Sequence, residues 1–383
     1  MFNQQLHIHY NYTPIAKCKS GNAQIITPPL LLITLMDLSA VAKAQMGGSM
    51  FKNVHIAGVG SYHPERKEEN QYYIDHFKQY NMEEHLTGLL HKLGRKTRTI
   101  AGEEETSISM AVNAANNAFL NSGIKPEEID MIISVSDTPE YLSPCCALLI
   151  KNKLQAVSAH TVFDMNSNCI GMLTAMDTAA RYLKTDKKYN KVLIAGSLLI
   201  RPQAREDDMV AYACTGDGAA AIILELREEP EERGLLGSRM FTDDSYYWSI
   251  TMPACGMSKI SDKTVDNDDK KMLWKPFDFD FLSEKWSALI TDLLSDYDYK
   301  PRQVSGYFMS QFSKADLNLT MERLGADLSQ AVYIGDQYGY TGCTSPVMAL
   351  DDKLQTDRFQ KDDIIIFCSV ASGYSMTALL YKW

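Results

Sequence analysis

Apolar residues beyond position 50 fall into two alternating patterns. Short continuous apolar runs predict buried strands, and they occupy residues 54–59, 130–135, 161–164, 191–196 and 219–224. Helical spacing of apolar residues predicts a helix over Ser107–Ser122 that ends at Gly123, and another over Cys145–Leu154. Strands that alternate with helices in this way predict an α/β fold built on a mostly buried sheet.

A weak internal repeat relates two distant parts of the chain. The segment from Cys169 to Ser197 runs as a helix, a Lys-Thr-Asp turn and the apolar strand KVLIAGS. The segment from Thr341 to Ser369 has the same length, a Gln-Thr-Asp turn and the strand IIIFCS. This period is too long for a solenoid and favours two duplicated α/β halves, which we place at residues 50–226 and 227–383. Two equivalent helix N-termini, one at Cys169 and one at Tyr340-Thr341-Gly342, would then meet near a shared centre.

Residues 1–49 have a different character from the rest of the chain. Their apolar run, Ile25–Met36, is interrupted by Pro28 and Pro29 and is too short for a membrane span of about 20 residues. It also lacks a directly preceding basic region and a clear cleavage site. We interpret residues 1–49 as a poorly ordered leader or a non-native extension, and we expect no membrane association.

Charge and cysteine content narrow the class of protein further. The net charge of −10 argues against nucleic-acid binding, which needs clustered Lys and Arg. The eight cysteines show no zinc-binding spacing, so no metal is predicted, and several lie in apolar stretches as free thiols would. Unpaired thiols are typical of a reducing compartment, and we therefore expect a cytoplasmic protein.

Cys169 is the strongest candidate for chemistry. In the segment FDMNSNCIGML a strand ends at Asp164, a polar connection follows, and a helix begins near Cys169. A helix N-terminus lowers the pKa of a cysteine and so increases the fraction of nucleophilic thiolate. The alternative interpretation is a buried core thiol, and the residues alone do not decide between the two.

The same segment, FDMNSNCIGMLTAMDTAARYL, resembles the nucleophile region of β-ketoacyl-acyl carrier protein synthase III. Three other stretches resemble that family in the same order along the chain. They are GRKTRTIAGEEETSISMAVNAANNAF, then VAYACTGDGAAAIIL with its glycine-rich turn, and the C-terminal DDIIIFCSVASGYSMTALLYKW. The resemblance covers residues 51–383. It implies the five-layered αβαβα thiolase fold, a homodimer, and transfer of an acyl group from coenzyme A or a carrier protein to Cys169 and then to a second substrate, with no permanently bound cofactor.

The sequence departs from the family at two catalytic positions. The segment GYFMSQFSKADLNL places Gln311 at the family's histidine, and YGYTGCTSPVMALDD places Tyr340 at its asparagine. No histidine follows His160 in the chain. A glutamine cannot act as a base, although its amide can donate a hydrogen bond, as can the Tyr340 hydroxyl. Acyl loading of Cys169 and transfer to an already nucleophilic acceptor therefore fit better than decarboxylative condensation, and specialised metabolism fits better than fatty-acid initiation.

The resemblance also assigns an oxyanion hole and an entrance. The hole would use the backbone N–H groups of Cys169 and Ser372, where the family has glycine at the second position. The family's coenzyme A-binding Trp and Arg correspond to Gly88 and Lys92. The basic cluster of Lys92, Arg95, Lys96 and Arg98 would receive phosphates or an acidic carrier protein, or it is simply a solvated charged surface. Leu142 lies near the position where a partner chain of the family inserts an apolar side chain.

Two other functions stay open at this point. The lost histidine and asparagine favour a supporting, non-catalytic role within a C-acetyltransferase complex of the diacetylphloroglucinol type, which is built from several different chains. In that role the protein would be a hetero-oligomer with another thiolase-like chain. A hydroxymethylglutaryl-coenzyme A synthase-like enzyme shares the acyl-cysteine stage but also expects a catalytic histidine.

Overall fold

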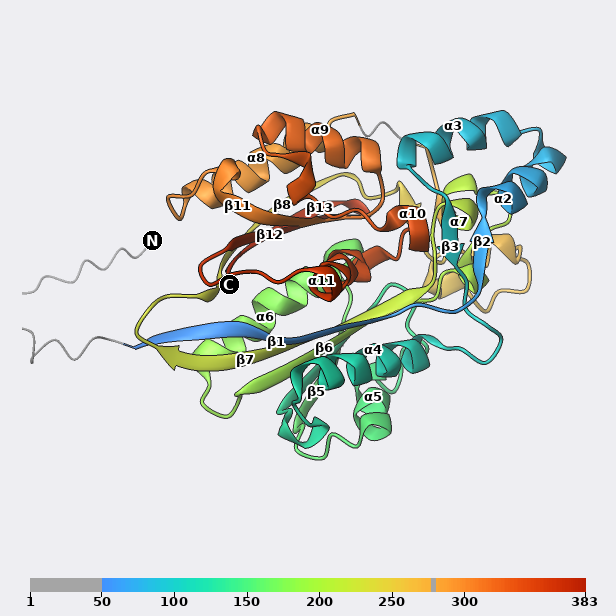
Figure 1. Ribbon diagram of the computed structural model, residues 1–383. Helices are drawn as coiled ribbons and strands as arrows, with labels where there is room; N and C mark the ends of the chain where they lie inside the picture. Colours follow the sequence, from blue (N-terminus) through green and yellow to red (C-terminus); the bar gives the residue numbers. More distant parts are fainter. Residues whose placement is uncertain (1–49, 277–279) are drawn as a thin grey trace, which may run out of the picture. The chain divides into compact units, whose positions relative to one another are not determined.

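The computed structural model describes residues 50–276 and 280–383, so the predicted leader at residues 1–49 lies outside the described residues. One nine-stranded mixed sheet runs through this part of the chain in the order β11-β12-β13-β8-β1-β7-β6-β4-β5. Only a single parallel bridge, Val54 to Gly234, joins β1 to β8. The sheet therefore consists of two smaller sheets that touch at one corner, and Figure 1 shows them as separate layers.

The first of these smaller sheets contains five strands. They are β1 (Phe51–Tyr62), β4 (Met131–Ser136), β5 (Thr161–Met165), β6 (Lys191–Leu198) and β7 (Gly218–Glu229). β7 pairs antiparallel with β1 and β6, whereas β4 pairs parallel with β6 and β5. All five strands predicted from apolar runs are confirmed, to within a few residues at their ends.

The second smaller sheet repeats this pattern with four strands. They are β8 (Gly234–Tyr246), β11 (Val304–Met309), β12 (Ile364–Ala371) and β13 (Gly373–Lys382). β13 pairs antiparallel with β8 and β12, and β11 pairs parallel with β12. The shared order of pairing confirms the duplication that the sequence repeat predicted. The proposed division between residues 226 and 227 falls within β7 and stays a prediction.

Helices cover both smaller sheets and fill the space between them (Figure 1). Between the two smaller sheets lie α6 (Gly171–Thr185) and α11 (Ser345–Thr356). The outer face of the first smaller sheet is covered by α4 (Ser107–Ser122) and α5 (Cys146–Leu154). The outer face of the second is covered by α8 (Leu282–Ser295) and α9 (Lys314–Leu324). These are the five αβαβα layers of the thiolase fold. The predicted helix at Ser107–Ser122 is confirmed, with Thr106 as its N-cap and Gly123 closing it at φ 72°.

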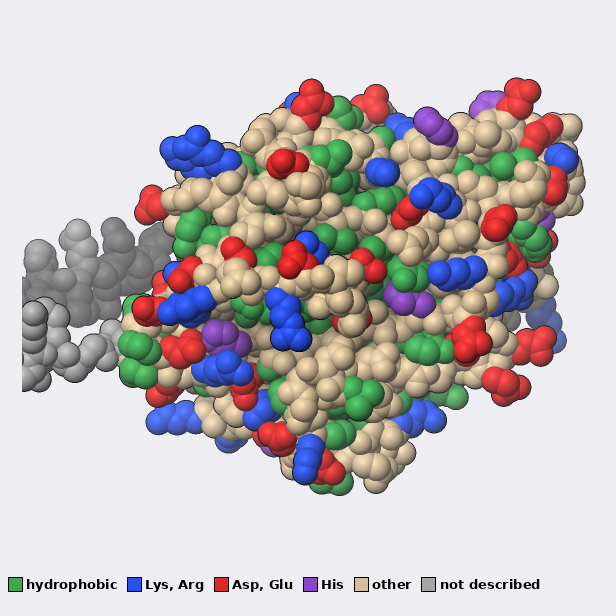
Figure 2. Space-filling view, in the orientation of Figure 1, with side chains coloured by type: hydrophobic (Ala, Val, Ile, Leu, Met, Phe, Trp, Pro, Cys, Tyr) green, Lys and Arg blue, Asp and Glu red, His purple; other side chains and the backbone are tan. Residues whose placement is uncertain are grey.

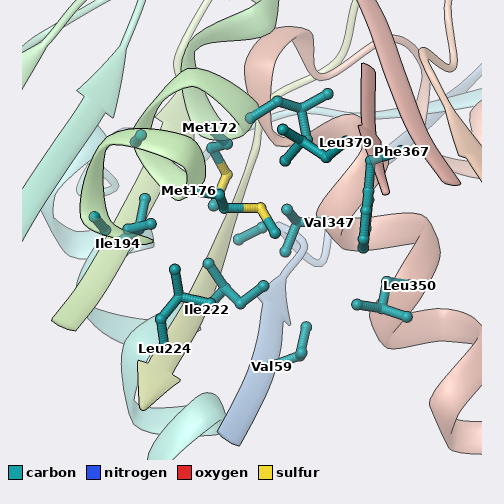
Figure 3. Close-up of a cluster of buried hydrophobic side chains, with 14 of the residues drawn as sticks. Val59, Met172, Met176, Ile194, Ile222, Leu224, Val347, Leu350, Phe367 and Leu379 are labelled. Carbon is teal, nitrogen blue, oxygen red and sulfur yellow. The ribbon is translucent and has the colours of Figure 1, made fainter. Parts of the chain in front are cut away.

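Strand periodicity explains how three cores form around two sheets. In β4, Met131, Ile133 and Val135 point to the central core, whereas Ile132 points to α4 and α5. In β12, Ile365 and Phe367 point to the same central core, and Ile364 and Ile366 point to α8 and α9. Both faces are apolar because both are covered by helices. Figure 3 shows Met172 and Met176 of α6 packing toward Val347 and Leu379 in the centre.

A smaller subdomain lies at one end of the layers. It contains α2 (Asn70–Phe77), α3 (Glu83–Leu93), α7 (Met209–Ala213) and the short strands β9 (Ile250–Thr251) and β10 (Leu273–Trp274). Its own apolar cluster includes Tyr73, Phe77, Leu86, Leu90 and Met272. Among the helices at residues 50–276 and 280–383, none combines the length and apolar character that a membrane span requires.

The central core sets much of the stability of the fold. Leu350 of α11 is fully buried in it, so Leu350→Ala should lower the free energy of unfolding by about 2–5 kcal/mol. Leu120 of α4 is 80% exposed, and Leu120→Ala should change it by less than about 0.5 kcal/mol. Urea unfolding of the two variants measures both values. Equal losses would contradict the assigned core.

Candidate active site

Cys169 lies where the two halves of the fold meet. It belongs to the 3-10 turn Asn168–Ile170 that leads into α6, and its backbone carbonyl accepts a hydrogen bond of 3.0 Å from the Ser369 hydroxyl of β12. Gly171, two residues further on, has room for no Cβ, because that atom would lie 2.5 Å from Val135 of β4. The 3-10 turn Gly342–Thr344, which leads into α11, packs against the same point through Cys343. The predicted meeting of two helix starts is confirmed.

Tyr340 is held beside Cys169 by the glycine-rich segment at residues 215–218. Its backbone forms a bridge with this part of the chain: Tyr340 N–H donates to the Cys214 carbonyl, and Gly216 N–H donates to the Tyr340 carbonyl, at 3.1 and 3.0 Å. A Cβ on Gly216 would lie 2.0 Å from the Tyr338 carbonyl, so only glycine fits there. Phe312 packs edge-on against the Tyr340 ring and stacks on Trp274. The phenol is therefore fixed on both its backbone and ring sides.

The thiol and the phenol open into a small cavity of about 90 Å³. Its wall combines polar and apolar side chains. The lining residues are Asp137, Asn166, Asn168, Cys169, Leu198, Ile200, Thr215, Ile250, Met252, Met272, Trp274, Tyr340, Gly342 and Ser372. None of them is histidine, lysine or arginine. A larger hollow of about 480 Å³ lies along β1 and the end of α11, but no cysteine, serine, threonine, tyrosine, lysine or histidine lines it.

Ser372 directs its backbone N–H at the sulfur of Cys169, and its part in an oxyanion hole stays a prediction. Hydrogen bonds from this amide and from the amide of Cys169 itself both lower the pKa of the Cys169 thiol. Ser372 lies in the turn between β12 and β13, where the positive φ angles fall on Gly373 and Tyr374 instead. Replacement of glycine by serine is therefore free of backbone strain, since residue 372 needs no left-handed conformation.

The net effect of the surroundings is to raise the pKa of Cys169, to about 12. Desolvation is the largest cause, and the charge of the neighbouring Asp137 adds to it; the Tyr340 hydroxyl and the two amides act in the opposite direction. The cavity exposes part of the residue, but protein encloses the sulfur. The prediction of a lowered pKa is wrong, because no cation of the described chain offsets the burial that the fold imposes.

Gln311 lies outside the cavity, contrary to its predicted place. Its Nε2 donates to the carbonyls of Met309 and Val332, at 2.8 and 3.0 Å, and its Oε1 accepts from Ile334 N–H at 2.7 Å. These bonds occupy both amide hydrogens and the oxygen, so the side chain braces the backbone and has no donor to offer a substrate. The geometry does not support a catalytic role for Gln311.

Ser310, one position earlier, faces the site that we assigned to Gln311. Its side chain is fully buried, and it lies close enough to Tyr340 to lower the pKa of that phenol, although it makes no hydrogen bond of ordinary geometry. Burial and Cys169 outweigh this effect, so the pKa of Tyr340 is raised well above 10 and the phenol stays a donor. Strand periodicity could have identified Ser310, because Phe308 points to the central core and Met309 points away from it.

The basic cluster predicted at the entrance is not a cluster of free cations. Arg95 is 3% exposed, and its guanidinium donates to four backbone carbonyls, of Cys214, Gln311, Phe312 and Gly335, and to the Tyr333 hydroxyl. Arg98 is fully buried over the Tyr73 ring and donates to Ala213 and Asn70. Both side chains are engaged by internal acceptors, so the expectation that they bind phosphate is wrong.

The other two members of that cluster are exposed. Lys96 forms an ion pair of 2.9 Å with Asp336, and Lys92 lies in the last turn of α3, the helix that also contains the exposed Gly88. On the face shown in Figure 2, Lys and Arg side chains alternate with Asp and Glu instead of gathering into one basic area. A role for Lys92 and Lys96 in binding the acyl donor stays a prediction.

Asp137 is the site residue that the sequence did not suggest. It follows β4, lines the cavity, and places Oδ2 3.9 Å from Cys169 Sγ. Desolvation raises its pKa to about 7, and contact with Cys169 only partly lowers it. Nothing in the local pattern of residues 136–138 marks it, because the proximity to Cys169 arises from strands that pair across the sheet.

Comparisons with known proteins identify one family of relatives. Residues 163–244 match the family model described as 3-oxoacyl-[acyl-carrier-protein] synthase III, and residues 294–383 match the C-terminal model of the same family. The β-ketoacyl-[acyl-carrier-protein] synthase III of Solibacter usitatus is 29% identical over 334 residues, which is 86% of this chain and 98% of that protein. That of Neisseria meningitidis is 26% identical over 331 residues, with the same two coverages.

Solved structures share the fold. The synthase III of Thermus thermophilus superposes with a TM-score of 0.76 at 20% identity, over 86% of this chain and 99% of that one. OleA of Xanthomonas campestris superposes with a TM-score of 0.70 at 18% identity, over 87% and 100%. The layers and the duplicated halves define a thiolase-fold protein. Within that superfamily, the chain belongs to the β-ketoacyl-acyl carrier protein synthase III-like family.

Loss of the Arg95 side chain should destabilise the protein. Arg95→Ala leaves buried carbonyls without donors, and we expect the free energy of unfolding to fall by about 2–4 kcal/mol. Lys92→Ala removes an exposed cation and should change it by less than about 0.5 kcal/mol. Denaturant unfolding measures both. A fully stable Arg95→Ala protein would contradict the bracing role.

The raised pKa of Asp137 makes stability depend on pH. Because its pKa is about 7 in the fold and 3.8 is the ordinary value, the neutral acid suits the fold and the carboxylate destabilises it. The penalty is absent below about pH 4 and complete above about pH 7. Asp137→Asn should therefore melt several degrees higher than the unmodified protein at about pH 8, and this gain should vanish on acidification. Thermal melts over that range test the sign.

Proposed function

We propose that this protein is a synthase III-type acyltransferase that carries its acyl group as a thioester on Cys169. The observation that carries the proposal is the sulfur at the floor of a cavity, at the start of the buried helix α6, with two backbone amides and the Tyr340 hydroxyl directed at it. These donors stabilise negative charge on the sulfur, and in this proposal the two amides then receive the oxyanion that forms when the thiol attacks a thioester. The relatives named as synthases support the same chemistry.

The donor in this proposal is an acyl-coenzyme A or an acyl-carrier protein. The names of the relatives refer to acyl carrier protein, and an OleA structure from Xanthomonas campestris holds lauroyl-coenzyme A. The cavity beside Cys169 is small, about 90 Å³, so it favours a short acyl group. The apolar side chains in its lining, Leu198, Ile250 and Met272 among them, suit the methyl end of such a group.

The second half-reaction we propose is transfer to an acceptor that is already nucleophilic. Decarboxylation of a malonyl group would need a group that stabilises the resulting enolate, and the residues that line the cavity include no imidazole. The lining residues with side-chain amides are Asn166 and Asn168, which lie in the segment just before Cys169. The hydroxyl of Tyr340, at the family's asparagine place, can donate a hydrogen bond but stays protonated at neutral pH. The neighbouring Ser310 hydroxyl is buried and is no base either.

Mass spectrometry of the intact protein tests the first half-reaction. Incubation with acetyl-coenzyme A or S-acetyl-N-acetylcysteamine should add one acetyl group, and Cys169→Ala should abolish the adduct because the nucleophile is gone. Lauroyl-coenzyme A should react more slowly than acetyl-coenzyme A if the cavity limits chain length. Cys255→Ala is the control, since Cys255 is a free thiol that does not line the cavity. An adduct that survives in Cys169→Ala would contradict the assignment.

A supporting role within a C-acetyltransferase complex of several chains is the second candidate. The lack of any cation beside Cys169 in the described part of the chain favours it, because a thiol with a pKa of about 12 reacts slowly on its own. That candidate predicts no adduct on the isolated chain, and activity with partner chains that persists in Cys169→Ala.

Oligomerisation is also part of the proposal. β5 is the outer strand of the sheet, so one of its edges has no partner strand within the described chain. Tyr141, Leu142 and Leu148 are exposed nearby in the sequence, ahead of and within α5. An open edge beside apolar surface supports pairing with a second thiolase-like chain, either a copy of this one or a different one.

A further inference from the structure

Asp137 differs from two other aspartates that the described chain encloses in part or in full, Asp208 and Asp217. Asp217 accepts backbone N–H bonds from Ala101, Ile200 and Arg201, and Asp208 accepts them from Val210, Ala211 and Trp274. These carboxylates order loops. Asp137 has no such donor among the described residues: Oδ1 is buried without a hydrogen bond, and Oδ2 meets only Cys169 Sγ, at 3.9 Å. A buried oxygen left without a partner calls for an explanation other than structural support.

We propose that Asp137 is the general base that takes the proton from Cys169, in place of an imidazole. This inference rests on the acyl-cysteine function proposed above. The Asp137 carboxylate accepts the Sγ–H proton while the sulfur attacks the thioester carbonyl carbon. The new S–C bond forms, the bond between that carbon and the donor's sulfur breaks, and the departing thiolate takes the proton from the Asp137 carboxylic acid. Nothing is oxidised or reduced, and the base is regenerated.

The electrostatics of the pair suit this transfer. Before it, the pair holds one negative charge on Asp137, and that charge is one reason the pKa of Cys169 is raised. After it, the pair still holds one negative charge, now on the sulfur, and the repulsion is gone because Asp137 is neutral. The sulfur is met by two backbone amides and by the Tyr340 hydroxyl, whereas the Asp137 carboxylate has no such donors among the described residues. Proton transfer therefore moves the charge toward its hydrogen-bond donors.

No other described group near Asp137 can serve as the base. The titratable groups that influence one another at this point are Asp137, Cys169, Tyr340 and Cys343. Burial raises the pKa of Tyr340 and of Cys343 well above their ordinary values, so both stay protonated near neutral pH. Only Asp137, with a pKa of about 7, is ionised in a large fraction of molecules at that pH.

The pH dependence of acylation tests the proposal. Quenched samples of the full-length protein with S-acetyl-N-acetylcysteamine, analysed by mass spectrometry between about pH 5 and about pH 10, give the rate at Cys169. In the unmodified protein the rate should rise through an inflection near pH 7 and then level off. Asp137→Asn should be slower by at least about 100-fold at neutral pH and should lose that inflection. Asp244→Asn, at an exposed carboxylate of β8, should match the unmodified protein.

Two results would overturn the proposal. If Asp137→Asn is acylated as fast as the unmodified protein, or faster, Asp137 is not the base, and its charge only raises the pKa of Cys169. The acyl-cysteine function would then hold without a role for Asp137. If the unmodified protein is not acylated by any thioester, the function itself fails, and the base with it. Iodoacetamide alkylation of Cys169 in the unmodified protein gives a readout that needs no variant. Its rate should show the same inflection near pH 7, and a rate that rises only above about pH 9 would also overturn the proposal.

Discussion

The site depends on the close contact between the starts of α6 and α11 at the centre of the molecule. Gly171 brings α6 within contact distance of β4 and Cys343, and Ser369 of β12 holds the Cys169 carbonyl from the other half. Each duplicated half thus supplies one helix start and one strand to the same point. A side chain on Gly171 would collide with Val135 and push the start of α6 away from β4, which would displace Cys169 from its place beside Tyr340 and the two amides. The fold is organised around this contact, and the surrounding cores make it rigid.

That contact also determines the charge balance of the site. It places Cys169 where water is largely excluded, so the thiol would be inert without help from its surroundings. In place of a cation, the protein supplies a buried carboxylate, a phenol and two amides. The total charge of the site is then a single negative charge shared by Asp137 and Cys169. Transfer of that charge toward the amides is what makes the thiol a nucleophile in the mechanism we propose.

Some features of the site were predictable from local sequence, and others were not. The place of Cys169 at the start of a buried helix was predictable, because strand, polar connection and helix follow one another around it in the chain. Ser310 was also within reach, because the alternation of β11, continued one residue past its end, puts Ser310 on the same face as Phe308. Arg95 and Arg98 were misassigned, because a run of basic residues gives no sign that the chain folds over them and supplies five acceptors to one guanidinium.

The sequence by itself determined the five strands of the first smaller sheet, β12, the helices α4, α5, α6 and α11, the duplicated halves and the cysteine at the head of α6. Hydrophobic periodicity acts over a few residues and can be read directly along the chain, which is why these features could be predicted. Only the tertiary structure decided the pKa of Cys169, the burial of the two arginines and the approach of Asp137. Those properties depend on which distant segments exclude water from a group and which donors they bring, and desolvation has no local signature in the sequence.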